Sequence, residues 1–224
     1  MPASDQQKSA SGPLEQPPTP IDRSHQTRAM SPLVYELFVL GELMVEPMYS
    51  ALLHEIAQRI LGPLRPLSWG ILSPLIRRLE QEGLTTSAVE QSRERLPRPA
   101  RGQPRRIYSI TPAGRERFFT LILTPSEYSR DTPEVFVIKL TKFQLLTPVQ
   151  RVMVLKWYRG YVYYLRTYYQ ARSSYILHNL EIKEGERSWI MQSVDYRFQL
   201  LNAELAWLDR QIAVCSGEQA SNNA

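Results

Sequence analysis

The chain has 224 residues, of which 43% are hydrophobic, and its formal net charge is +5 at pH 7. This length suits one large or two small globular domains with a buried core. No run of about 18 apolar residues is present, which argues against a membrane-spanning helix and predicts no membrane partner. Cys215 is the only cysteine, so no internal disulfide can form. Because the N-terminus also lacks an apolar signal segment, we expect a cytoplasmic protein.

The N-terminal third predicts a tail followed by two helices. Residues 1–30 are rich in Ser, Gln and Pro, so we expect a disordered tail. Ser31-Pro32 then favours a helix start, because a hydroxyl N-cap and a proline at the first helical position suit the free amides there. We expect helices over 32–44, apolar nearly all round, and over 48–61, with a break at Pro47.

A third helix is expected from about Ser68, ending at Gly83, which is well placed as the residue after the C-cap. Leucine and isoleucine side chains recur at helical spacing and predict its core face: Leu72, Leu75, Ile76 and Leu79. Pro74 predicts an irregular first turn, because its ring crowds the carbonyl four residues earlier. On the other face, small residues come first and cations follow. We predict that this face is a contact surface for a binding partner, made by Ser68, Gly70, Ile71, Ser73, Pro74, Arg77 and Arg78.

Two strands with a basic loop between them are expected next, over 84–91 and 105–110. Residues 92–106 hold six arginines and a single acidic residue, Glu94. Arginine both attracts phosphate and forms paired hydrogen bonds with it. The predicted phosphate contacts are Arg93, Arg95, Arg98, Arg101, Arg105 and Arg106. The alternative is a solvated loop that keeps the protein soluble.

Thr111-Pro112 predicts a fourth helix, to about Leu123. The order of three helices, strand, basic loop, strand and helix is that of a winged helix-turn-helix domain, here over 31–123. In such a domain the third helix enters the major groove, and the hairpin contacts phosphates or the neighbouring minor groove. The partner predicted for this domain is double-stranded DNA.

Three segments resemble the PadR family of bacterial transcriptional regulators. "RRIYSITPAGRE" is similar to the family's wing strand and following helix, "LSWGILSPLIRRLEQEGL" to its recognition helix, and "GELMVEPMYSALLHEI" to its first two helices. The resemblance covers 33–123 and, more loosely, the chain to about 212. It implies a homodimeric DNA-binding regulator. Ile71 and Ser73 depart from the Thr and Tyr usual in the family, so the resemblance does not carry over an operator sequence.

The C-terminal half predicts a helical domain over 124–214 and a flexible tail over 215–224. A connecting helix is expected over about 133–143, followed by long helices over 148–182 and 186–214. The last helix has apolar residues at near-heptad spacing, and a helix pair alone buries only part of such a surface. We therefore expect homodimerisation, with packing onto the first domain as the alternative. The predicted dimerisation residues are Tyr161, Leu165, Tyr168, Ile190, Val194, Phe198, Leu201, Leu205, Leu208 and Ile212.

The resulting hypothesis is a sequence-specific DNA-binding regulator, expected to be a repressor, that acts as a homodimer on a palindrome-like operator. The alternative is a winged-helix protein-interaction module. The many tyrosines suggest a pocket for a small aromatic or hydrophobic effector between the C-terminal helices and the winged domain, although aromatic residues at helical spacing also pack as a core. The scattered histidines predict no metal site or cofactor. No phosphate-binding loop or nucleophile motif is found, so we expect no enzyme.

Overall fold

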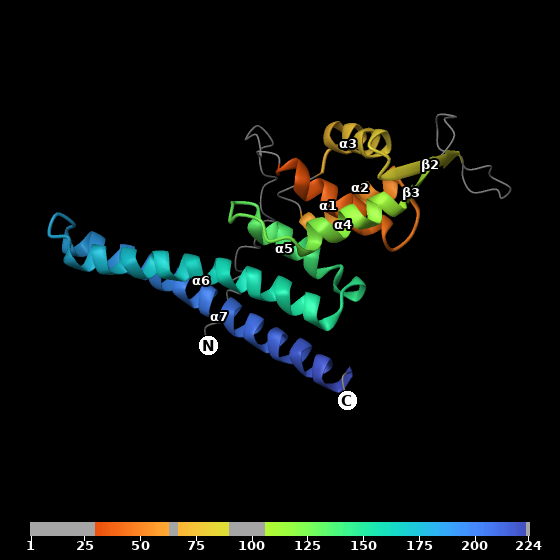
Figure 1. Cartoon of the computed structure of the whole chain (residues 1–224). Helices are drawn as coiled ribbons and strands as arrows, with labels where there is room; N and C mark the ends of the chain where they lie inside the picture. The colour runs from red at the N-terminus through yellow and green to blue at the C-terminus, as the bar shows by residue number, and fades with distance from the viewer. Residues whose placement is uncertain (1–29, 63–66, 90–105, 223–224) are drawn as a thin grey trace, which may run out of the picture.

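Figure 1 shows the computed structural model, which describes residues 30–62, 67–89 and 106–222. The chain is mainly α-helical with a small antiparallel sheet, as the sequence predicts. The N-terminal elements are α1 (Pro32–Leu43), β1 (Met48–Tyr49), α2 (Ser50–Leu61), α3 (Trp69–Gln81), β2 (Thr85–Val89), β3 (Arg106–Ile110) and α4 (Pro112–Leu123). They form a winged helix-turn-helix arrangement, which confirms the fold class.

Helix α1 lies at the centre of this domain and is surrounded by α2, α3, α4 and α5. Every residue from Val34 to Leu43 is buried, which agrees with the nearly uniform apolar character of the segment. Gly41 allows α4 to approach closely, because a Cβ atom there would lie 3.2 Å from the Phe118 ring. Two carboxylates, Glu36 and Glu42, are buried in the same helix and need partners.

The sheet has the strand order β1-β3-β2. The expected start of the second helix at Met48 was wrong, because Met48 and Tyr49 pair with Tyr108 and Ile107 of β3 instead. Helix α2 therefore begins at Ser50. Strands β2 and β3 pair along their whole length, from Thr85 opposite Ile110 to Val89 opposite Arg106.

The junction between the sheet and α4 is tightly packed. The Thr111 hydroxyl donates to the Gly83 carbonyl at 2.6 Å and accepts from the Gly114 amide at 3.1 Å, so it caps α4 and holds the end of α3 at once. Gly83 has a φ of +72°, as expected for the residue that ends a helix. Gly114 admits no side chain, because a Cβ atom there would overlap the Leu84 carbonyl oxygen.

The C-terminal half consists of α5 (Thr132–Leu140), the 3-10 helix η1 (Phe143–Leu145), α6 (Pro148–His178) and α7 (Glu184–Asn222). Helices α6 and α7 form a long hairpin beside the winged domain (Figure 1). Thr147 and Gln150 cap α6 reciprocally, through bonds of 3.3 and 2.9 Å. Helix α6 ends earlier than expected, and α7 continues past the expected end at Val214. No described helix is long and apolar enough to cross a membrane.

Contacts of α5 and of the segment after it connect the hairpin to α1. The Phe136 ring of α5 stacks on Tyr158 of α6 at 3.8 Å, and the Tyr158 hydroxyl donates to Glu204 of α7 at 2.6 Å. Burial, and then that hydrogen bond, raise the pKa of Tyr158 above its ordinary value. Just beyond α5, the Lys142 ammonium lies 2.6 Å from the buried Glu42 carboxylate of α1. The hairpin is therefore fixed to α1 through α5 and the segment that follows it.

Replacing Gly114 by alanine is expected to destabilise the protein by about 1–3 kcal/mol, because the methyl group would collide with the Leu84 carbonyl and lie 2.8 Å from the Ile110 side chain. Urea unfolding followed by circular dichroism measures the change. Gly185→Ala is the matched control, since a Cβ atom on this α7 glycine meets nothing within 4 Å. A Gly114→Ala protein as stable as the control would show that the junction is loosely packed.

Candidate nucleic-acid interface

Helix α3 presents one face to the core and the other to solvent. Leu72, Leu75, Ile76 and Leu79 are buried, as the 3.6-residue spacing predicts. Gly70, Pro74, Arg77 and Gln81 are exposed on the opposite face, and Ile71, Ser73 and Arg78 flank it half-buried. The division into two faces is thus confirmed, whereas contact with DNA stays a prediction.

Pro74 does not disturb the helix as expected. Helix α3 runs without interruption from Trp69 to Gln81, with Pro74 inside it. Because proline has no amide hydrogen, the Gly70 carbonyl lacks its usual helical donor. Gly70 is exposed, so water can satisfy that oxygen. The irregular first turn predicted from the sequence is therefore wrong.

The start of α3 rests on α2 through a ring contact that the sequence did not reveal. Trp69 stacks on His54 with ring centroids 4.5 Å apart and an interplanar angle of 5°. The two residues are far apart in the sequence, so only the packing of α2 against α3 identifies the pair.

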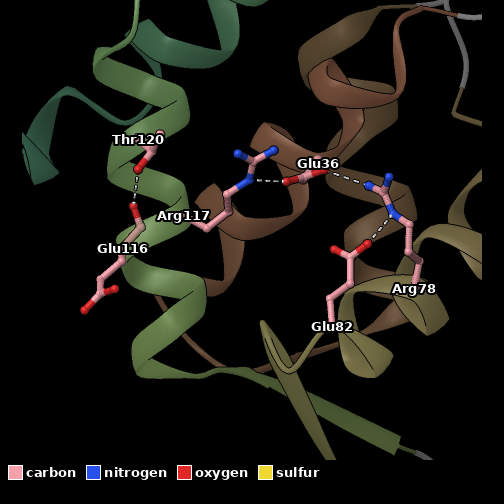
Figure 2. Close-up of polar contacts among 6 residues, drawn as sticks. All are labelled: Glu36, Arg78, Glu82, Glu116, Arg117 and Thr120. Atoms are coloured by element: carbon pink, nitrogen blue, oxygen red, sulfur yellow. Dashed lines mark hydrogen bonds and ion pairs between the residues drawn. The ribbon is translucent and has the colours of Figure 1, made fainter.

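The two neighbouring arginines of α3 have different surroundings. Arg77 is exposed; its Nε donates to the Ser73 carbonyl one turn earlier, at 3.3 Å, and it pairs with no carboxylate among the described residues. Arg78 points to the core, where its Nη2 donates to Glu36 Oε2 at 2.7 Å (Figure 2). A rotation of about 100° per residue separates the two side chains. Arg77 is exposed on the solvent face of α3, whereas Arg78 takes part in the fold.

Glu36 joins three helices. Its carboxylate, only 3% exposed, accepts from Arg78 of α3 and, at 2.7 Å, from Arg117 Nε of α4, as Figure 2 shows. Glu82 lies 3.8 Å from the Arg78 Nε. Two guanidinium groups therefore share one buried carboxylate. Sequence reasoning missed this cluster, although a buried glutamate in a helix that is otherwise apolar signals a need for partners.

The hairpin of β2 and β3, which we call the wing, is attached to α3 by a series of side-chain hydrogen bonds. The Ser87 hydroxyl of β2 donates to Glu80 at 2.6 Å, and Arg106 Nη1 of β3 lies 3.4 Å from the same hydroxyl oxygen. Arg106 is exposed at the end of β3. The other predicted phosphate contacts lie outside the described residues: Arg93, Arg95, Arg98, Arg101 and Arg105. On either side of these residues, Val89, the last residue of β2, pairs with Arg106, the first residue of β3.

The near-heptad seam of the last helix packs within the chain. Val194, Leu201 and Leu208 are buried, and α6 is the main neighbour of α7. The α6–α7 hairpin of one chain covers these three side chains, and dimerisation through this surface stays a prediction. Tyr161, Leu165, Leu205 and Ile212 pack partly against the same core, and Ile190 and Phe198 are half-buried. Of the ten predicted residues, Tyr168 is the one that belongs to the exposed surface.

Large exposed side chains occur elsewhere on the hairpin. They include Tyr163, Tyr164, Tyr175, Trp189, Tyr196 and Leu200. The predicted effector pocket between the domains stays a prediction. In that region Tyr128 packs against Trp157, Tyr161 and Tyr164, and its hydroxyl donates to the Trp157 carbonyl. Within the described part of the chain, no group of three or more His, Cys, Asp or Glu side chains could hold a metal ion.

The fold and the exposed α3 face define a winged helix-turn-helix protein with a helical C-terminal hairpin. No protein-family model and no curated protein matches the sequence. Among solved structures, Bacillus subtilis PadR in complex with operator DNA matches at 12% identity and a TM-score of 0.35, over 81% of this chain and 99% of that one.

A PadR-like transcriptional regulator from Bacillus cereus matches at 20% identity and a TM-score of 0.33, over 82% of this chain and 99% of that one. The circadian clock associated protein Pex from Anabaena matches at 22% identity and a TM-score of 0.34, over 42% of this chain and 75% of that one. The resemblance to PadR proteins inferred from the sequence thus recurs among solved structures. Similarity at this level does not assign a function.

Glu36→Gln is expected to lower the free energy of unfolding by about 3 kcal/mol, because a neutral amide leaves Arg78 and Arg117 without their shared negative charge. Arg77→Ala is the matched control within α3 and should change stability by no more than about 0.5 kcal/mol. Urea unfolding at pH 7 measures both. Equal stability of the two variants would show that the buried cluster does not hold α3.

Proposed function

We propose that this chain is a DNA-binding transcriptional regulator in which α3 enters the major groove. The observation that carries the proposal is the exposed face of α3. Small residues, Gly70 and Ser73, lie at its start and permit close approach of the backbone. Arg77 follows, with no carboxylate partner among the described residues, and an arginine in the groove can bond guanine O6 and N7.

The wing supplies the second contact in this proposal. Arg106 is the first residue of β3, opposite Val89, and is connected to α3 through Ser87 and Glu80. Phosphate contacts position a protein on the duplex, and base contacts specify sequence. We propose that Arg106 binds phosphate, together with Arg93, Arg95, Arg98, Arg101 and Arg105.

We further propose that the protein acts as a homodimer. Support comes from the large aromatic side chains that α6 and α7 expose, since extensive exposed apolar surface on a monomer commonly marks an interface. Two-fold symmetry would place two α3 helices on half-sites about 34 Å apart, on a palindrome-like operator. We propose a repressor that blocks the promoter it occupies and that responds to a small apolar ligand.

Arg77→Ala is expected to relax sequence preference, with a loss of about 1–3 kcal/mol of discrimination at one base pair. Arg106→Ala should weaken binding to all duplexes alike and reduce the salt slope by about one. Fluorescence anisotropy with promoter fragments and random duplex, over a series of salt concentrations, measures both. Arg210→Ala, an exposed arginine of α7, serves as the control and should bind like the wild type.

Two results would contradict the assignment of the groove-facing helix. The first is an Arg77→Ala protein with unchanged preference and affinity. The second is a wild-type protein that binds no promoter fragment more tightly than random duplex at any salt concentration. The second result would favour the alternative function, a winged-helix module that uses its basic surface to bind an acidic protein.

A double variant, Tyr168→Asp with Tyr196→Asp, is expected to halve the mass measured by light scattering. Both side chains are more than half exposed on the hairpin, and two charges there would oppose burial against a second copy. Val45→Asp, at an equally exposed apolar residue of the winged domain, is the control and should leave the mass unchanged. A dimer that survives the double variant would place the interface elsewhere.

A further inference from the structure

A cavity of about 330 Å³ lies between the start of α1 and the first half of α3. Its walls include Met30, Pro32 and Tyr35 on the α1 side, and Ile71, Pro74 and Leu75 on the α3 side. The volume is within the range of small-molecule sites, which are mostly apolar with a few placed polar groups. This cavity is separate from the aromatic residues between the winged domain and the hairpin.

Two polar groups line the otherwise apolar wall. The Tyr35 hydroxyl accepts from the Met30 amide at 3.3 Å, and its own proton has no acceptor among the described residues. Arg78 also borders the cavity; its Nη2 donates to Glu36, while its side chain remains 40% exposed. Both groups can therefore donate a hydrogen bond to a bound molecule.

The charge at this wall favours an anion. Arg78 and Arg117 share the single buried carboxylate of Glu36, which leaves one positive charge in excess. Glu82 is 3.8 Å from Arg78, but it is about half exposed and its field is screened by solvent. We propose that the cavity binds a small molecule with an apolar body and a single carboxylate, which accepts hydrogen bonds from Arg78 and Tyr35.

Such a ligand would act on DNA binding, and this second step rests on the function proposed above. The occupant contacts Gly70 and Pro74, which belong to the exposed face of α3, and Arg78, which holds α3 to α1. The ligand in the cavity and DNA would therefore compete for contact with α3. Because coupling between two sites is reciprocal, operator DNA would weaken the ligand as much as the ligand weakens DNA.

Calorimetric titration of the full-length protein with octanoate, octylammonium and 1-octanol tests the site without DNA. The three probes share one apolar chain and differ in the head group. Octanoate is expected to bind one molecule per chain, at least tenfold more tightly than octylammonium, with octanol between them. Absence of octanoate binding, or equal affinity for the cation, overturns the proposal.

Gly70→Leu is expected to abolish octanoate binding by filling the cavity. An added Cβ atom there meets only the Ser68 hydroxyl oxygen, at 3.7 Å, so the fold can accept it. Gly185→Leu is the matched control on α7 and should bind like the wild type. Tyr35→Phe, which keeps the ring, should weaken octanoate about fivefold through the lost hydrogen bond. Unchanged affinity in both Gly70→Leu and Tyr35→Phe would place the ligand elsewhere and overturn the proposal.

The coupling is tested by anisotropy with promoter DNA at increasing octanoate. The wild type should lose DNA affinity at least tenfold at saturation, and Gly185→Leu should do the same. Octanoate that binds without changing DNA affinity refutes the coupling and leaves the site intact. A protein that binds octanoate but no DNA refutes the proposed function while the calorimetric result for the cavity stands.

Discussion

The position of α3 depends on the two ion pairs that the Glu36 carboxylate forms with Arg78 and Arg117. A buried charge is tolerated only with partners, and both arrive from other helices, Arg78 from α3 and Arg117 from α4. The core residues of α3 bring it against α1 but are non-directional, because apolar contacts permit rotation and sliding. Two charge-assisted hydrogen bonds at 2.7 Å have preferred directions and select one orientation. That orientation turns Arg77 outward.

A second constraint fixes the wing relative to the same helix. Thr111 bonds to the Gly83 carbonyl at the end of α3 and caps α4, and Gly114 lets that cap approach Leu84 without a clash. Strand β3 ends immediately before this junction, so the direction of the hairpin is set where α3 and α4 meet. Arg77 is thus held by α3, and Arg106 by its hydrogen-bonded path to the same helix through Ser87 and Glu80. A DNA-binding surface requires this fixed spacing, since two contacts on a duplex must match its grooves at once.

The sequence correctly predicted those features that depend on residues close together in the chain. The two faces of α3 follow from residue spacing, and the Thr147 cap from neighbouring residues. Contacts between residues far apart in the sequence could not be predicted from these patterns. Strand β1 forms only because β3 lies beside Met48. The two partners of Glu36 are 42 and 81 residues away from it. The apolar seam of α7 was found correctly as a seam. The spacing alone does not distinguish an antiparallel neighbour in the same chain from a helix of a second chain, and the structure shows the first for Val194, Leu201 and Leu208.

A continuous series of packed contacts connects the hairpin to α3. Tyr158 of α6 stacks on Phe136 of α5, the segment after α5 supplies Lys142 to Glu42 of α1, and α1 holds α3 through Glu36. No flexible linker interrupts this path within the described residues. If two chains associate through their hairpins, the separation of their α3 helices is therefore set by packing in each chain. Under the proposed function, the operator spacing would then be a property of the fold. A ligand in the proposed cavity between α1 and α3 would act at the last contact of the series, where a displacement of α3 leaves the hairpin in place.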